Sequence, residues 1–258
     1  MTGSRPPSPD RAGVLLDLDD TLVDTRYAFG QAISAIVATW LPHLDAEGEA
    51  AALQHWVRDA GGHFRAYTRG ESSFAEQRHR RAVALHAAFD GPTLSVADQH
   101  RWSEAYDVAF REAWRLFPDA VPLLERLELL GLPYGLVTNA GAAYQRDKLQ
   151  RVGLADRFEV MVAVDDLGVG KPDPRVFHLA CERLGVSPGR SLYLGDEPDA
   201  DARGARAAGL VGVWLDRSWG GRGDRDGQPT PDDVPVVGSL LELADLLDAG
   251  AFPTLVRI

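Results

Sequence analysis

Acidic side chains follow directly on a short apolar run near the start of the chain. The segment Gly13–Leu18 is typical of a buried parallel strand, and Asp17 and Asp19 stand at its carboxyl end. Because side chains alternate across an extended strand, the two aspartates lie on the same side, and Leu18 points away into the core. Two carboxylates placed in this way can divide the work of one reaction between them.

Reactive side chains also follow later apolar segments of the chain. They are Thr138 and Asn139 after a second strand, Lys171 in the loop Gly170–Pro174, and Asp196 after a further strand, with Asp201 five residues on. In open parallel sheets, ligands bind outside the carboxyl ends of the strands. We therefore expect carboxylates, a hydroxyl group and one lysine to meet at a single rim of a sheet.

Several carboxylates at one rim repel one another and raise their own pKa values unless a cation or a lysine compensates. This crowding implies a metal ion. Oxygen ligands without nearby His or Cys favour Mg²⁺, which takes one or two carboxylates and leaves its other positions to water and phosphate oxygens. The sequence therefore predicts Mg²⁺ as the cofactor and a phosphorylated compound as the substrate.

Lysine is rare in this chain. Among its 27 basic residues only Lys148 and Lys171 are lysines, and the rest are arginines. The bias towards arginine needs no functional cause, but it makes each lysine a position to explain. A compact ammonium can approach a carboxylate and a phosphate together, whereas a guanidinium is broader and planar. This difference favours a role for Lys171 at the predicted rim.

The elements that position these residues fall into two patterns. From about Arg26 to Leu116 the apolar residues have helical periodicity without a strand signal. Helices are predicted near Tyr27–Trp40, Ala46–Asp59, Ser73–Phe89 and Ser95–Leu116.

The second half of the chain alternates between helices and strands. The predicted helices are Val121–Leu130, Ala142–Arg151, Pro174–Leu184, Asp201–Ala208 and Leu240–Leu247, and the predicted strands are Tyr134–Thr138, Phe158–Ala163, Ser191–Gly195, Val211–Leu215 and Val234–Val237. A Gly-rich loop is predicted at Trp219–Gly227. Such alternation is typical of a parallel sheet covered on both faces.

The sequence therefore predicts an α/β fold, with a Rossmann-like parallel sheet core and an inserted all-helical domain. The core takes residues 12–25 and 117–258, and the insert takes residues 26–116. Residues 1–11 are rich in Pro and Ser and are predicted to form a flexible tail.

In residue order, these motifs resemble the haloacid dehalogenase-like superfamily of phosphohydrolases over essentially the whole chain. The resemblance implies that Asp17 is the nucleophile, which forms an aspartyl-phosphate, and that Asp19 is the general acid and then the base. It implies phosphate binding by Thr138, the backbone around Asn139, and Lys171.

The same resemblance implies a metal site and a lid. Asp17, Asp196 and the carbonyl of Asp19 would bind Mg²⁺, with Asp201 as a hydrogen-bond partner behind these ligands. Many relatives carry Ser after the Gly-Asp of the last motif, where this chain has Glu197. The helical insert resembles the cap found between the first and second motifs of one subgroup, which favours small phosphorylated metabolites as substrates.

Two groups of residues in the insert have a structural and a functional interpretation. The basic run Arg78-His79-Arg80-Arg81, with Arg65 and Arg69 nearby, is typical of a solvated helix face, although one of its arginines could bind a second anionic group of the substrate. The tryptophans Trp40, Trp56, Trp102 and Trp114 are expected to pack the insert rather than to stack on a ligand.

Composition excludes several classes of protein. The 27 basic and 38 acidic residues give a formal charge of −11, which argues against a nucleic-acid partner. No apolar run approaches the roughly 18 residues of a membrane span, so no membrane partner is expected. The start of the chain lacks the apolar segment of a secretory signal, which favours a cytoplasmic location. The sequence does not indicate the oligomeric state.

The three alternatives to a phosphatase are a phosphomutase, a haloacid dehalogenase and a regulatory binding protein. A phosphomutase would return the phosphoryl group to a bound sugar phosphate. A haloacid dehalogenase would need neither a metal nor Asp19 as an acid, and is therefore disfavoured. A regulatory protein that binds a phosphorylated ligand without turnover would need no general acid, so the presence of both aspartates argues against it.

Overall fold

The computed structural model describes residues 11–217 and 233–252, and the chain divides into two compact units. The first unit consists of Met1–Val23 and Leu116–Ile258, and the second of Asp24–Arg115. The predicted tail at 1–11 lies outside the described residues except for Arg11, and the predicted Gly-rich loop lies outside them entirely.

A six-stranded parallel sheet forms the centre of the first unit, in the order β3-β2-β1-β4-β5-β6. The strands are β1 (Gly13–Leu16), β2 (Tyr134–Val137), β3 (Met161–Val162), β4 (Ser191–Gly195), β5 (Val211–Leu215) and β6 (Val236–Val237). The helical unit is inserted between β1 and β2. The predicted α/β fold with a parallel sheet and an all-helical insert is therefore confirmed.

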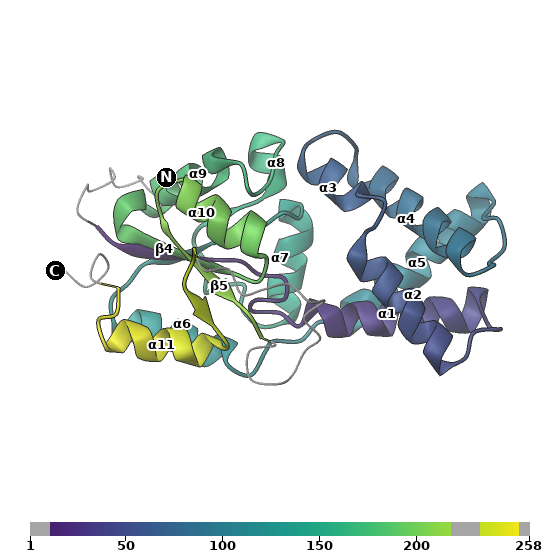
Figure 1. Ribbon diagram of the computed structural model, residues 1–258, viewed down its shortest axis with the longest axis horizontal. Helices are drawn as coiled ribbons and strands as arrows, with labels where there is room; N and C mark the ends of the chain where they lie inside the picture. Colours follow the sequence, from purple (N-terminus) through teal and green to yellow (C-terminus); the bar gives the residue numbers. More distant parts are fainter. Residues whose placement is uncertain (1–10, 218–232, 253–258) are drawn as a thin grey trace. The chain divides into compact units, whose positions relative to one another are not determined.

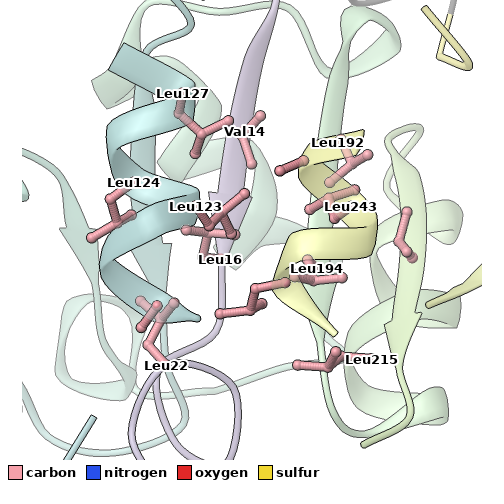
Figure 2. Packing of buried hydrophobic residues seen from close by; sticks show 14 of the residues in the cluster. Val14, Leu16, Leu22, Leu123, Leu124, Leu127, Leu192, Leu194, Leu215 and Leu243 are labelled. Atoms are coloured by element: carbon pink, nitrogen blue, oxygen red, sulfur yellow. The ribbon is translucent and has the colours of Figure 1, made fainter. Parts of the chain in front are cut away.

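Helices cover both faces of this sheet (Figure 1). On one face, α6 (Ala120–Leu129) and α11 (Leu240–Asp248) pack their leucines against β1, β4 and β5, as Figure 2 shows. On the other face lie α9 (Pro174–Leu184) and α10 (Gly204–Ala207). This double cover explains why the strands are apolar at nearly every position.

Strand β1 shows how the alternation serves both faces. Val14 and Leu16 enter the cluster with α6 and α11, whereas Leu15 enters the cluster with α9. Leu18, beyond the end of the strand, is fully buried in the first cluster, as predicted. The packing on both sides fixes the point at which β1 ends and therefore the position of Asp17.

The helical unit contains five helices within the described residues. They are α1 (Thr25–Trp40), α2 (Ala46–Arg58), α3 (His63–Thr68), α4 (Phe74–Ala88) and α5 (Val96–Glu112). Polar caps begin four of them: Asp24, Asp45, Ser73 and Ser95 each accept a backbone N–H of the first turn. The sequence prediction included these four and missed the short helix α3.

Aromatic rings form the interior of the helical unit. Trp56 and Trp102 are buried beside Tyr106, and Trp56 Nε1 donates to the Tyr106 hydroxyl at 2.9 Å. The prediction that tryptophans pack this unit is confirmed for these residues. The solvated-face interpretation is wrong for two arginines, because Arg78 and Arg81 stack over the Tyr106 and Trp56 rings.

The first unit differs from the prediction at two places. Residues 201–208 do not form one α-helix; a π-helix, η2 (Pro198–Arg203), leads into α10. A single helical turn, α8 (Val164–Leu167), was not predicted. Helix α7 (Ala142–Arg151) matches its prediction, and a 3₁₀ turn, η1 (Pro188–Arg190), precedes β4.

None of the helices formed by residues 11–217 and 233–252 has both the length and the apolar character needed to cross a membrane.

Candidate active site

The carboxyl ends of three adjacent strands bring the predicted residues together. Strand β1 lies between β2 and β4, and all three run in parallel. Asp17 directly follows β1, Thr138 follows β2, and Asp196 follows β4. Because the three strands are hydrogen-bonded neighbours, side chains that follow them share one rim of the sheet.

Lys171 is the centre of a buried charge cluster at this rim. Its Nζ lies 2.6 Å from Asp17 Oδ1 and 2.7 Å from Asp201 Oδ1. The same Nζ donates to the Tyr193 hydroxyl at 2.8 Å. Lys171 and Asp17 are each only 5% exposed. A single ammonium group therefore holds the nucleophile candidate, a second carboxylate and a phenol in fixed positions.

Burial and mutual repulsion shape the electrostatics of this cluster. Burial raises the pKa of Asp17 to about 8, and the nearby carboxylates of Asp201 and Asp19 add to this effect, while the Lys171 ammonium opposes it. The pKa of Asp196 is also raised, by burial first and then by Asp20 and Asp17. Burial opposes the charge of Lys171, but the ion pairs with Asp17 and Asp201 hold its pKa above the ordinary value.

The loop that carries Lys171 is fastened by Asn139. Asn139 Oδ1 accepts from the Lys171 backbone N–H at 2.6 Å, and its Nδ2 donates to the Lys171 carbonyl at 3.1 Å. A Cβ at Gly170 would lie 2.3 Å from Asn139 Oδ1, so only glycine fits there. Asn139 was predicted to contribute its backbone to phosphate binding; in the structure its side chain positions the lysine loop.

Asp201 is held by β4 and by the start of η2. Its Oδ1 accepts from the Tyr193 hydroxyl at 3.0 Å, in addition to the Lys171 ammonium, and its Oδ2 accepts from the Glu197 N–H at 2.9 Å. A Cβ at Gly195 would lie 2.2 Å from Asp201 Oδ2, so this approach also requires glycine. The side chain of Glu197 is exposed.

Three carboxylates of the cluster could hold a divalent metal ion. One oxygen from each of Asp17, Asp196 and Asp201 lies within 4.8 Å of the other two. Only Lys171 forms an ion pair with members of this trio among the described residues. Because the pKa of Asp196 is raised by burial and neighbouring carboxylates, the negative charge there is not fully compensated. The donor set is made of hard oxygen ligands, which fits Mg²⁺.

Asp19 contacts two residues that the sequence analysis did not select. Gln145 Nε2 donates to Asp19 Oδ2 at 2.6 Å, and Lys148 Nζ forms an ion pair with Asp19 Oδ1. Gln145 Nε2 also lies 2.7 Å from Thr138 Oγ1. The general-acid candidate and the predicted phosphate-binding hydroxyl are therefore joined by one amide group.

The residues that were not predicted differ in how far the sequence alone could have indicated them. Lys148 was visible as one of only two lysines, although its partner could not be deduced. Gln145 had no signal of its own. Tyr193 lies in the middle of β4, where an aromatic residue is ordinary packing, and its ring is fully buried. The contact of its hydroxyl with Lys171 becomes visible only in the folded structure.

The basic run of the helical unit is largely occupied by contacts within that unit. Arg78 Nη1 pairs with Asp107 Oδ1 at 2.9 Å, and Arg81 Nη2 donates to the Trp56 carbonyl at 2.6 Å. Arg69 pairs with Glu71. These contacts do not support the alternative that Arg78 or Arg81 binds a second anionic group.

Known proteins are similar to this chain in sequence and in fold. The family model for haloacid dehalogenase-like hydrolases matches residues 12–209. A phosphoserine phosphatase from Thermus thermophilus is 33% identical over 243 residues, which cover 85% of this chain and 93% of that protein. A phosphoglycolate phosphatase from Yersinia pseudotuberculosis is 31% identical over 245 residues, with 94% of each chain covered.

A solved structure has the same fold. The putative hydrolase YfnB of this superfamily from Bacillus subtilis, crystallised with magnesium, has a TM-score of 0.73 and 24% identity, and the match covers 93% of this chain and 100% of that one. The chain belongs to the haloacid dehalogenase-like hydrolase family. It is therefore an enzyme, and the cluster around Lys171 lies where its motifs converge.

Proposed function

We propose that this protein is a Mg²⁺-dependent phosphatase that hydrolyses a small phosphorylated metabolite through an aspartyl-phosphate. The observation that carries the proposal is the pair of carboxylates after β1. Asp17 is buried and held by Lys171 at 2.6 Å, and Asp19, two residues on, is held separately by Gln145 and Lys148. Two carboxylates with different partners suit two different roles.

In the first half of the reaction, a carboxylate oxygen of Asp17 forms a bond to phosphorus while the bond from phosphorus to the leaving oxygen breaks. Asp19 gives its proton to that oxygen, so that an alcohol leaves. Lys171 and Thr138 stabilise the charge on the phosphoryl oxygens. Phosphoryl transfer depends mainly on such positioning and charge stabilisation.

In the second half, Asp19 is a carboxylate and takes a proton from water. The water oxygen attacks phosphorus, the bond between phosphorus and the Asp17 oxygen breaks, and inorganic phosphate is released. Asp19 thereby regains its proton and Asp17 its carboxylate, so the protein ends as it began.

Asp17, Asp196 and the Asp19 carbonyl are proposed to hold the Mg²⁺, which would neutralise charge on the phosphoryl oxygens. We assign Asp201 to the fixing of Lys171, because both of its oxygens already accept hydrogen bonds from the protein. Asn139 is assigned to the same task through its two contacts with the Lys171 backbone.

The relatives support a small substrate. The phosphatases that match most of this chain are named for phosphoserine and phosphoglycolate, which are both small phosphorylated acids. At 31–33% identity the substrate itself does not transfer. We therefore propose the class of small phosphomonoesters, and a panel of such compounds assayed for free phosphate would identify the member.

The test compares the wild type with Asp17→Asn on p-nitrophenyl phosphate and on the panel. We expect phosphate release with Mg²⁺, loss of release with a chelator, recovery when Mg²⁺ is restored, and no turnover by Asp17→Asn. Turnover by Asp17→Asn at the wild-type rate would refute the proposal.

The alternatives predict other results in the same assay. Binding of panel compounds without phosphate release would identify a regulatory binding protein. Transfer of the phosphoryl group within a sugar phosphate, without incorporation of labelled water oxygen into phosphate, would identify a mutase. Halide release in the presence of a chelator would identify a dehalogenase.

A further inference from the structure

Helix α7 directs two buried polar side chains at Asp19. Gln145 is 0% exposed and Lys148 is 1% exposed. They are three residues apart, which places them on the same side of the helix. Gln145 contacts Asp19 Oδ2 and Lys148 contacts Asp19 Oδ1, so each carboxyl oxygen has its own donor. This arrangement fixes the rotation of the carboxyl group as well as its place.

The burial of Lys148 calls for a strong partner. A buried ammonium is costly unless it is paired and hydrogen-bonded, and leaving it unpaired would destabilise the fold. Asp19 supplies the pairing. Since nearly all other cations of this chain are arginines, a lysine here also indicates that a compact donor is needed.

Gln145 adds a second connection. The same Nε2 that donates to Asp19 Oδ2 lies 2.7 Å from Thr138 Oγ1. Thr138 follows β2 and Asp19 follows β1, so the amide bridges the ends of two neighbouring strands. The distance between the proton donor and the proposed phosphate-binding hydroxyl is thereby fixed by helix α7.

We propose that Gln145 and Lys148 are positioning residues that aim the Asp19 carboxyl group at the leaving oxygen. This inference rests on the proposed phosphatase activity. Neither residue exchanges a proton with the substrate. The step they serve is the one in which the bond from phosphorus to the leaving oxygen breaks, the Asp17 oxygen bonds to phosphorus, and the Asp19 proton moves to the leaving oxygen.

A displaced Asp19 carboxyl group should change the reaction rate in a way that a general loss of folded protein does not. The good leaving group p-nitrophenolate departs without being protonated. Unsubstituted phenolate is more basic, and its departure depends more on protonation by an acid. Displacement of the Asp19 carboxyl group should therefore lower the rate more for substrates with poor leaving groups than for those with good ones. The value of kcat/KM reports this step, because it covers the reaction up to the first irreversible bond cleavage.

The experiment measures kcat/KM of Lys148→Met and Gln145→Leu on a series of para-substituted phenyl phosphates. Both replacements preserve approximate side-chain volume. We expect phenyl phosphate to lose about tenfold more activity than p-nitrophenyl phosphate, which corresponds to a steeper dependence on the basicity of the leaving group. An unfolded fraction lowers both rates equally and cancels in their ratio.

Two controls separate positioning from other roles. Arg151→Gln removes an exposed cation from the same helix, where Arg151 pairs with Asp147, and should leave the ratio unchanged. In an Asp19→Asn background, Lys148→Met should cause no further change in the ratio, because the group through which it acts is gone.

An equal loss on all leaving groups would overturn the inference and show a purely structural role. A change in the ratio that persists in the Asp19→Asn background would also overturn it, since Lys148 would then act on the phosphate directly. If the wild type released no phosphate from any phosphomonoester with Mg²⁺, the proposed function itself would fail, a result distinct from either of these.

Discussion

The two lysines of this chain share one rim of the sheet but serve different carboxylates. Lys171 approaches the oxygens of Asp17, Asp201 and Tyr193, and Lys148 pairs with Asp19. A guanidinium spreads its donors over a plane and could not direct one point charge at three converging oxygens. At the scale of single residues, the chemistry therefore depends on the size of the cation as much as on its charge.

Removal of the Tyr193 hydroxyl should lower activity and stability without abolishing either. In Tyr193→Phe the ring still packs, but Lys171 loses one of its oxygen contacts and Asp201 loses a donor. We expect kcat/KM on p-nitrophenyl phosphate to fall about tenfold and unfolding to cost about 1 kcal/mol less. Steady-state kinetics and urea unfolding measure both.

Tyr134→Phe is the matched control. Its hydroxyl donates to Glu128 at 2.7 Å, and Tyr134 begins β2, at the end of the strand away from Thr138. Activity should not change in this variant. A tenfold loss in both variants, or in neither, would contradict the assignment of Tyr193 to the Lys171 cluster.

The buried acids should make stability depend on pH. The pKa of Asp17 rises to about 8 in the folded protein and that of Asp196 is also raised, so between about pH 4 and 8 the folded state binds more protons than the unfolded state. The stability of the metal-free protein must then fall as pH rises through this window, by at most about 1.4 kcal/mol per pH unit for each such proton.

The measurement is thermal unfolding with a chelator from pH 5.5 to 8. Asp196→Asn removes one of the acids with a raised pKa and should flatten the pH dependence. Mg²⁺ should stabilise the wild type more at pH 8 than at pH 6, because it favours the carboxylate form. An identical pH dependence in wild type and Asp196→Asn would show that Asp196 does not hold an extra proton in the folded state.

Residues at strand ends could be predicted, and residues that act through packing could not. Apolar runs typical of buried strands precede Asp17, Thr138 and Asp196. Because these strands are parallel neighbours, the three side chains meet at one rim of the sheet. Gln145 lies in a helix whose apolar periodicity indicates which of its faces is buried, but not which residues that face contacts. Its contact with Asp19, 126 residues away, depends on how α7 docks on the sheet, which single-sequence periodicity does not contain.

At the scale of elements, local capping and breaking signals determined what could be predicted. Helix α9 begins at Pro174 after the Asp173 cap and ends before Gly185 in the left-handed region, and both bounds were predicted. The π-helix η2 also begins at a proline, Pro198, but no side-chain cap accepts a hydrogen bond at its start. It places the Asp201 carboxylate at the Glu197 N–H, four residues earlier, and the sequence pattern did not indicate this geometry.

The loop before α9 should not tolerate a side chain at Gly170. A Cβ there would lie 2.3 Å from Asn139 Oδ1, and the clash would displace the contacts that hold the Lys171 backbone. For Gly170→Ala we expect kcat/KM to fall by at least about tenfold and stability to fall by about 1–3 kcal/mol. Kinetics and urea unfolding test both effects.

Gly189→Ala provides the comparison. A Cβ at Gly189 meets no atom within 4 Å, so this variant should keep activity and lie within about 0.5 kcal/mol of the wild type. Wild-type activity in Gly170→Ala would contradict the fastening of Lys171 by Asn139.

At the scale of the whole molecule, the helical unit joins the sheet unit through two adjacent chain segments. Val23 and Leu116 form an antiparallel bridge, and the Asp24 N–H donates to the Arg115 carbonyl at 3.0 Å. The Arg115 guanidinium also pairs with Asp24 at 2.6 Å. Both ends of the insert are thus held side by side, so a short turn can connect them without the helices between.

The sheet unit should therefore fold and retain chemistry when residues 25–114 are replaced by a short Gly-rich turn. Asp17, Lys171, Asp196 and Asp201, together with the α7 residues that hold Asp19, all belong to that unit. We expect cooperative thermal unfolding, and Mg²⁺-dependent release of p-nitrophenol from p-nitrophenyl phosphate above the level of the same shortened chain carrying Asp17→Asn. A folded but inactive shortened chain would contradict this, because it would show that the helical unit supplies an essential group. An active one would show that the sheet rim performs the transfer without any group from the helical unit.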